Sequence, residues 1–510
     1  MPRTLPLTVL TNPINRAGTP LSLAARPSAA PGPKEKCGVI GIWGHPRGAQ
    51  LCYLGLYAQQ HRGQESAGIA VTDGAKLHHH TGMGLVPQVF DARLLTELDT
   101  LGSAGAIGHN RYSTSGGSVA CNAQPLLENY IGGQVALAHN GNLINADRTR
   151  RRFEEAGHLF HTTSDTEVII HILASPAQQR SHDPLAATLR YLQGAFSLVF
   201  LFPDRIECAR DPWGWRPLVI GRLPHLGTGE AGRGPYVVAS ETVALDVLGA
   251  TLVREVEPGE IVTINDSGIS SRRFADPAPR LAHCVFEHVY FANPASVVFG
   301  QNVQVARERM GEQLAREAPA IADCIAPMPD SGRSAALGYS RISGTPYREA
   351  IVPNRYVGRT FIKPSQDARA AAVRLKLNII DELVRGKSLV IVDDSIVRGT
   401  TTKAKMDQLR AAGVKEIHLR ISCPPIRHPC YFGVDFAHRS ELIANGRTVE
   451  EIRRYLGVDS LYYLSLEGLL SCMKHPQPQY CTACYSGDYR LDPLNPLAGE
   501  VIEPQQATMF

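Results

Sequence analysis

The chain of 510 residues lacks any apolar run approaching the ~18 residues that a membrane-spanning helix needs, which excludes a spanning protein. It lacks a secretory signal, because the apolar stretch 5–10 is too short and is followed by Asn12-Pro13. It also lacks a strong charge bias, since 52 Lys and Arg against 48 Asp and Glu give a formal net charge of +4. That balance gives no argument for a nucleic-acid partner. Hydrophobic residues at 44% and charged residues at 20% are typical of a soluble globular protein with roughly two or three domains.

Acidic residues are missing from the first 34 positions, where proline occurs seven times. Residues 1–36 are therefore expected to form a disordered leader without a continuous helix. Eleven cysteines without a secretory signal predict reduced thiols and a cytoplasmic location. The leader also has the composition of a transit peptide, which leaves a plastid as the alternative. We favour a propeptide or an over-extended start, because of the cysteine at position 37.

The region 37–270 is rich in short apolar segments separated by Gly, Asn and Pro. The predicted strands are 39–43, 104–112, 134–139, 195–202 and 236–239. Helices are expected near 51–60 and 165–174, and the second is expected to open with a capping box from Ser164 to Glu167. This region is predicted to be an α+β domain.

The region 280–470 alternates buried strands with helices, which predicts an α/β domain with a doubly wound parallel sheet. The predicted strands are 322–328, 388–392 and 416–422, and the predicted helices are 303–317, 334–340 and 402–412. Residues 471–510 are expected to form an irregular tail.

Cys37 stands at the head of the first predicted strand. A thiol needs a base for nucleophilic catalysis, and no nearby histidine is evident. Removal of residues 1–36 would give Cys37 a free α-amino group of pKa ~7.7–8.0, suited to taking its proton. The alternative is a buried strand cysteine, the commoner role of a lone Cys.

Two further segments favour the catalytic interpretation. His139-Asn140-Gly141-Asn142 offers an amide and a backbone N–H for an oxyanion hole, although Asn-Gly also favours a hairpin turn. Arg111, at a predicted strand end, suits a substrate carboxylate, and Asp165 suits an α-ammonium group. An amino-acid substrate would satisfy both.

These segments resemble the N-terminal-nucleophile glutamine amidotransferases. The motifs are Cys37-Gly-Val-Ile-Gly-Ile, Gln60-His-Arg-Gly-Gln-Glu65, the strand ending at Arg111, Asn140-Gly141, Ser164-Asp-Thr-Glu167 and Asp211-Pro-Trp-Gly-Trp-Arg-Pro-Leu218. The resemblance implies an αββα sandwich, Cys37 as nucleophile, and Asn140 and Gly141 as oxyanion hole. It also implies that Arg111 and Asp165 bind glutamine, and that residues 1–36 are removed by proteolysis.

The segment 389–401 is an apolar strand that ends in Asp393-Asp394 and continues through a Gly/Thr loop into a helix. Loop N–H groups and a helix N-terminus bind anions, whereas the acids suit ribose hydroxyls or Mg²⁺. The alternative is a solvated turn with a capping threonine. The segment resembles the loop of type I phosphoribosyltransferases that binds 5-phosphoribosyl-1-pyrophosphate (PRPP).

Two other segments resemble the pyrophosphate loop (328–333) and the mobile lid (354–361) of that fold. The resemblance implies that Ser331, Asp393 and Asp394 contact Mg²⁺. The PRPP-binding residues that it implies are Asp330, Ser331, Gly332, Asp393, Asp394, Ser395, Arg398, Gly399, Thr400, Thr401, Arg355 and Arg359. Pro353 departs from the lysine usual in relatives, which puts one phosphate contact of the lid in doubt.

A glutaminase followed by a phosphoribosyltransferase resembles the glutamine PRPP amidotransferase family. The resemblance implies the first committed step of purine synthesis: glutamine, PRPP and water give 5-phosphoribosylamine, pyrophosphate and glutamate, with internal transfer of ammonia. It further implies feedback by purine nucleotides and a homotetramer. The alternative is a PRPP-binding regulatory protein with an inactive glutaminase. Asn293-Pro294-Ala295-Ser296 replaces the Arg-Pro-Asp-Ser usual in relatives, which weakens inferences about ion pairing or effector binding there.

Cys481-x-x-Cys484 is a chelating pair, and Cys284 and Cys430 flank the second domain. Four thiolates can hold a [4Fe–4S] cluster or zinc, and unliganded thiols are the third possibility. Some members of the family carry such a cluster, and these four positions match its ligands. The remaining cysteines are interpreted as packing residues: Cys52, Cys121, Cys208, Cys324, Cys423 and Cys472. His78-His79-His80 is predicted to lie on a surface strand or loop rather than in a metal site.

Overall fold

The computed structural model describes residues 37–112, 117–224, 234–353, 377–434 and 439–492, with the side chain of residue 377 excepted. The leader, the proposed lid residues Arg355 and Arg359, and the end of the tail lie outside the described residues. The described residues all fall within one compact unit. Among the described residues, none of the helices has both the length and the apolar character needed to cross a membrane.

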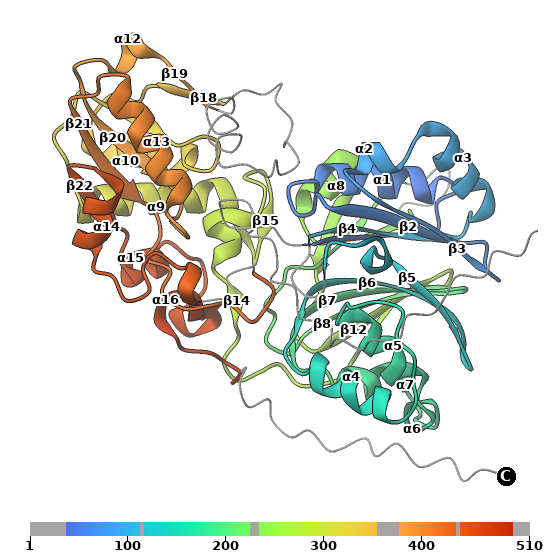
Figure 1. Cartoon of the computed structure of the whole chain (residues 1–510). Coiled ribbons are helices and arrows are strands. Elements are labelled where there is room, and N and C mark those ends of the chain that lie inside the picture. Colours follow the sequence, from blue (N-terminus) through green and yellow to red (C-terminus); the bar gives the residue numbers. More distant parts are fainter. Residues whose placement is uncertain (1–36, 113–116, 225–233, 354–376, 435–438, 493–510) are drawn as a thin grey trace, which may run out of the picture. The chain divides into compact units, whose positions relative to one another are not determined.

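Two antiparallel sheets form the first half of the chain (Figure 1). One sheet has the strand order β11-β9-β10-β1-β4-β2-β3, and the other has the order β13-β12-β8-β7-β6-β5. The strands of the first sheet are β1 Gly38–Trp43, β2 Ser66–Thr72, β3 Leu77–Met83, β4 Gly105–Arg111, β9 Val219–Arg222, β10 Tyr236–Ala239 and β11 Thr251–Glu255. The strands of the second are β5 Leu126–Tyr130, β6 Gly133–Leu143, β7 Gly194–Phe202, β8 Arg205–Arg210, β12 Glu260–Asn265 and β13 Gly268–Arg273.

Helices cover the outer face of each sheet, so the order of layers is αββα, as predicted (Figure 1). Over the first sheet lie α1 Gly48–Ala58, α2 Val86–Val89, α3 Ala92–Leu101 and α8 Thr242–Leu248; over the second lie α4 Ala146–Glu155, α5 Thr166–Ala174, α6 Pro176–Gln179 and α7 Pro184–Leu189. Alternation along β1 explains the layering. Val39 and Trp43 pack between the sheets, whereas Ile40 and Ile42 pack on the helix side with Leu56.

A parallel four-stranded sheet forms the second half, in the order β17-β20-β21-β22. Its strands are β17 Cys324–Pro327, β20 Ser388–Asp393, β21 Glu416–Ile421 and β22 Ser460–Tyr463; its helices are α9 Val303–Glu317, α10 Arg333–Ser343, α12 Asp381–Val384, α13 Thr400–Ala411, α14 Val449–Leu456 and α15 Leu466–Ser471. The alternation of strand and helix confirms the predicted α/β architecture. Strands β17 and β20 are parallel neighbours, so their carboxyl ends lie at the same edge of the sheet. The loops that follow these two strands therefore meet at that edge.

The remaining described elements are short. They are β14 His283–Cys284, the π-helical turn Glu287–Phe291, β15 Val297–Val298, β16 Gln301–Asn302, β18 Ile351–Pro353, β19 Leu377–Ile379, β23 Tyr480–Cys481 and α16 Ala483–Ser486; three 3₁₀ turns span Ala120–Asn122, Arg439–Glu441 and Gln477–Gln479. β14 pairs in parallel with β23, which brings the tail back to the connection between the halves.

The predicted capping box at Ser164 is wrong. Helix α5 begins at Thr166, and Ser164 Oγ accepts a hydrogen bond from the Thr166 N–H (3.3 Å). The Glu167 carboxylate accepts from the N–H groups of His161 and Thr162 (2.8 Å each). The preceding loop therefore folds back over the helix start and takes the acceptor that a capping box would use.

Helices α9 and α10 pack closely at two glycines. A Cβ on Gly338 would lie 1.9 Å from the Glu308 carbonyl oxygen, and one on Gly311 would lie 1.9 Å from that of Ala335. Neither position has room for a methyl group, because the obstacle is backbone rather than a movable side chain.

We expect Gly338→Ala to lower the free energy of unfolding by about 2 kcal/mol, because the clash exceeds the ~1 kcal/mol gain in helix propensity. Denaturant unfolding would measure it. Leu337→Ala on the same helix, where the side chain is 40% exposed, should change stability little. A more stable Gly338→Ala protein would contradict this packing.

Candidate functional site

Cys37 lies immediately before β1, against the end of β4. Cys37 is 7% exposed, and its thiol donates to the Tyr112 carbonyl oxygen (3.4 Å). Asn110, a residue without a predicted role, fixes this position: its Oδ1 accepts from the Gly38 N–H (2.8 Å), and its Nδ2 donates to the carbonyl oxygens of Leu56 and Gln59. The only signal in the sequence for this role of Asn110 is its place in the strand that ends at Arg111.

Burial raises the pKa of the Cys37 thiol to about 11, although the hydrogen bond to Tyr112 and the charge of Arg111 lower it in part. The charge of Asp165 raises the pKa of the Cys37 thiol. The charges of both predicted glutamine-binding residues therefore reach the predicted nucleophile. The thiol is protonated near neutral pH and needs a base.

Asn140 and Gly141 lie within β6, opposite Ser197 and Phe196 of β7. The hairpin-turn alternative is therefore wrong, because the strand continues to Leu143. The Asn140 side chain is 0% exposed, and neither amide atom has a partner among the described residues. A buried amide without a partner costs about 1–3 kcal/mol, so its presence favours a ligand-binding role.

Gly141 is required by strand packing, since a Cβ there would lie 1.9 Å from the Ala195 carbonyl oxygen. Asp165 is buried at the far end of β6, where its Oδ2 accepts from the Leu143 N–H (2.9 Å). Arg111 is also buried, and its Nη1 donates to the Gly117 carbonyl oxygen (3.1 Å). Backbone contacts thus orient both charged groups.

The second predicted site forms where the loops after β17 and β20 meet. Asp394 accepts from the Ser331 hydroxyl at Oδ1 and from the Ser395 hydroxyl at Oδ2 (2.5 Å each), and the Asp394 N–H donates to Asp393 Oδ1 (3.0 Å). Burial, and next the charge of Asp394, raise the pKa of Asp393 well above its usual range. The three residues predicted to contact Mg²⁺ are therefore adjacent.

The loop that follows shows features of an anion site. Gly399 has a φ of 76° at the start of α13, a conformation that favours glycine. The Thr401 hydroxyl is buried, without a partner among the described residues. A Cβ on Gly332 would lie 2.3 Å from the Val392 carbonyl oxygen, so the loop after β17 packs against the end of β20.

Two charged residues of the prediction are already paired. Arg398 contacts Glu441 (2.7 Å), and Asp330 contacts Arg333 (2.7 Å). The first pair holds Arg398 at the short turn Arg439–Glu441, and the second leaves Asp330 largely exposed.

The four predicted cluster cysteines share one region. Cys284 and Cys481 are partners in the β14–β23 ladder. Burial raises the pKa of the Cys484 thiol, and the neighbouring Cys430, Cys481 and Cys284 raise it further. However, the described ranges contain no group of three or more His, Cys, Asp or Glu side chains arranged to hold a metal ion. The donor chemistry suits a soft metal centre, but the side chains do not form a closed coordination set.

The other cysteines are buried as predicted, with one exception: Cys121 is exposed in the turn Ala120–Asn122, so its interpretation as a packing residue is wrong. The histidines at 78–80 lie on β3, at the edge of the first sheet, as predicted. Pro353 pairs with residue 377 at the end of β18.

Before removal of residues 1–36, we expect Cys37 to react with iodoacetamide about 10²-fold more slowly at pH 7–8 than an ordinary thiol of pKa ~8.5, because its pKa is about 11. The thiolate fraction should rise about tenfold per pH unit up to pH 10. Peptide mass spectrometry would measure the rates at which iodoacetamide alkylates Cys37 and the exposed Cys121 in one sample. Equal rates at pH 7 would contradict the raised pKa.

Comparison with known proteins identifies the family. Residues 109–246 match a family model described as a glutamine amidotransferase domain. The chain is 48% identical to the amidophosphoribosyltransferase of Methanothermobacter thermautotrophicus over 461 residues, which are 89% of this chain and 94% of that protein. It is 46% identical to that of Bacillus subtilis, with 90% of this chain and 94% of that one covered.

Solved structures give the same result. A structure described as the allosteric regulatory enzyme of purine biosynthesis superposes with a TM-score of 0.81 at 45% identity, covering 89% of this chain and 96% of that one. The B. subtilis glutamine PRPP amidotransferase in complex with ADP and GMP superposes with a TM-score of 0.80 at 45% identity, covering 89% and 97%. The chain belongs to the amidophosphoribosyltransferase family, the glutamine-dependent phosphoribosyltransferases of purine biosynthesis.

Proposed function

We propose that this chain makes 5-phosphoribosylamine, pyrophosphate and glutamate from glutamine, PRPP and water at two sites. Residues 37–270 carry the glutaminase, 280–470 the phosphoribosyltransferase, and 471–510 a tail with cluster ligands. The observation that supports this best is the Asn140 amide, which is buried without a partner in the half of the chain that contains Cys37. A hydrogen bond from this amide to a substrate oxygen would satisfy its buried donor.

Removal of residues 1–36 supplies the base in the glutamine reaction. The new α-amino group takes the Cys37 proton, and the thiolate attacks the glutamine side-chain amide. Asn140 Nδ2 and the Gly141 N–H stabilise the oxyanion, and the α-ammonium group returns its proton to the leaving nitrogen, so that ammonia leaves. Water then hydrolyses the thioester to glutamate and restores the thiol. Arg111 binds the substrate carboxylate and Asp165 its ammonium group, which selects an amino acid.

The loop 395–401 and the N-terminus of α13 hold the 5-phosphate of PRPP, with Thr400 and Thr401 hydroxyls as further donors. The partnerless Thr401 hydroxyl supports this. Ser331, Asp393 and Asp394 would hold Mg²⁺, which when bound offsets charge on the pyrophosphate. The remaining predicted contacts are Asp330, Gly332, Ser395, Arg398, Gly399, Arg355 and Arg359.

The two reactions should separate by mutation. We expect Cys37→Ala to lower glutamine-dependent pyrophosphate release at least about 10³-fold, while ammonia-dependent release stays within about twofold. Asp394→Asn should lower both, because it weakens the metal and PRPP site. Cys52→Ala, which removes a buried thiol of α1, is the matched control.

Loss of ammonia-dependent release in folded Cys37→Ala protein would contradict two separable sites. Failure of the wild-type chain to release glutamate or pyrophosphate would favour the regulatory alternative. N-terminal mass analysis of the active protein tests the base, since an active chain that still begins at Met1 would exclude the α-amino group of Cys37.

We also propose that Cys284, Cys430, Cys481 and Cys484 hold a [4Fe–4S] cluster that attaches the tail to the connection between the halves. Their common location and the pairing of Cys284 with Cys481 support this. Anaerobically purified protein should contain iron and sulfide. Cys484→Ser should lose most of both, whereas Cys423→Ser, which alters a buried neighbour bonded to the Pro424 carbonyl oxygen, should retain them. Stoichiometric zinc, or no metal, would contradict the cluster.

We also propose that purine nucleotides inhibit this chain by feedback. The structure of the B. subtilis relative in complex with ADP and GMP supports this. The proposal also includes a homotetramer, testable by sedimentation. The location proposed is the cytoplasm; a plastid is the alternative, because the soybean relative is described as chloroplastic.

A further inference from the structure

Two histidines face one another in the outer layer of the first half, outside both proposed sites. His158 follows helix α4, and His171 lies in the last turn of α5, which packs beside α4 over the second sheet (Figure 1). The Nδ1 atoms of the two rings are 3.2 Å apart. His158 is exposed, whereas the His171 side chain is 19% exposed, so solvent reaches the pair from the side of His158.

Aromatic contacts hold both rings in this arrangement. The Phe153 ring packs edge-on against His158, with the ring centroids 4.8 Å apart, and it also lies 5.7 Å from the His171 ring. The Phe160 ring lies 4.1 Å from that of His171 and is itself covered by the Arg150 guanidinium at 4.1 Å. The orientation of the two imidazoles is therefore set before any ligand binds, which lowers the entropy cost of chelation.

Glu167 determines which nitrogen of His171 carries the proton. Its carboxylate accepts from the N–H groups of residues 161 and 162 (2.8 Å each) and from the Thr162 hydroxyl (2.7 Å). Its Oε1 lies 3.8 Å from His171 Nε2, one turn along α5. A fixed carboxylate beside Nε2 favours the tautomer with the proton on that atom. His171 Nδ1 therefore presents its lone pair toward His158.

The separation of the two Nδ1 atoms suits a bound cation. Two ring nitrogens that face one another repel unless a proton or a cation lies between their lone pairs. In a tetrahedral zinc site with Zn–N bonds of about 2.0–2.1 Å, two nitrogen ligands lie roughly 3.3 Å apart. The observed 3.2 Å matches that distance. The pair can therefore chelate an ion without movement of either ring.

We propose that His158 and His171 bind a divalent cation of the zinc type through their Nδ1 atoms, with water in its other positions. Imidazole ligands select such ions over Mg²⁺ and Ca²⁺, which prefer oxygen. Glu167 orients His171 and does not itself bind the ion. The ion ties the loop 156–165 to α5 and exchanges with solvent, because the protein supplies two ligands only. Neither histidine belongs to the proposed glutamine or PRPP site.

The test treats full-length protein with diethyl pyrocarbonate, which modifies free imidazoles, and measures the modification of each histidine by peptide mass spectrometry. Micromolar Zn²⁺ should slow the modification of His158 and His171 together, at least about tenfold and with one midpoint. His161 of the same loop, 73% exposed, is the internal control and should change less than about twofold. Mg²⁺ at the same concentration should protect neither ring. Reading each histidine separately keeps zinc bound at the cysteines out of the result.

His158→Ala should abolish the protection of His171 and should lower the zinc bound in equilibrium dialysis by about one ion per chain, whereas His161→Ala should change neither quantity. The exposure of His158 makes this variant the one that keeps the fold. Protection of neither ring in the wild type would leave a hydrogen-bonded imidazole pair and overturn the proposal. Equal protection of His161, or full protection of His171 in His158→Ala, would also overturn it.

Discussion

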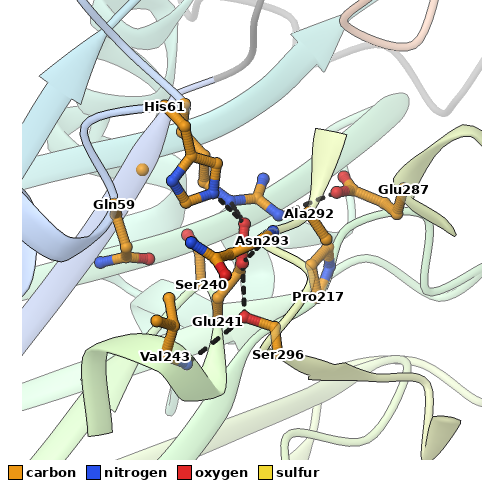
Figure 2. A network of polar contacts seen from close by, with 12 residues as sticks. Gln59, His61, Pro217, Ser240, Glu241, Val243, Glu287, Ala292, Asn293 and Ser296 are labelled. Carbon is orange, nitrogen blue, oxygen red and sulfur yellow. Dashed lines mark hydrogen bonds and ion pairs between the residues drawn. The ribbon is translucent and has the colours of Figure 1, made fainter. Parts of the chain in front are cut away.

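The ion pair between Arg62 and Glu287 connects the two halves of the chain, and the loss of either side chain would leave an unpaired buried charge. Both side chains are fully buried, so each charge must be offset by protein groups rather than by water. Arg62 comes from the segment after α1 and Glu287 from the connection after β14. Around this pair, Glu241 binds Arg62 from the start of α8 (Figure 2), and Arg216 extends the alternation of acids and bases to the segment 430–433. The arrangement of the halves therefore depends on charges distant in sequence.

The two proposed sites have the opposite character, because polar groups there are left without complete partners. Asn140 and Thr401 have buried polar atoms without protein partners, and Asp393 and Asp394 are adjacent carboxylates. Such groups reduce stability unless a ligand satisfies them. The surrounding backbone supplies the rigidity: β6 is paired on both sides, and the loop after β17 packs against the end of β20 at Gly332. Stability and binding capacity thus occupy different parts of the molecule.

Contiguous motifs were predictable because their chemistry is local. The order strand, two acids, Gly/Thr loop and helix at 389–401 predicts its own geometry, and the structure has β20 and α13 there. Short apolar segments likewise predicted five of the thirteen strands described in the first half. The capping box at Ser164 failed because residues 161 and 162 compete for Glu167. The hairpin alternative at Asn140 failed because pairing with β7 overrides a local turn preference.

By itself, the sequence determined the two-part architecture and the family, and it predicted the reactive groups. Each depends on residues close together in the chain, whose spacing and order carry the information. Only the tertiary structure decided that Asn110 holds the start of β1, that Glu241 meets Asn293, and that Gly433 lies against Gly141. Those contacts join residues 52 to 292 positions apart, and a buried charge or close backbone approach leaves no local pattern when its partner comes from another element.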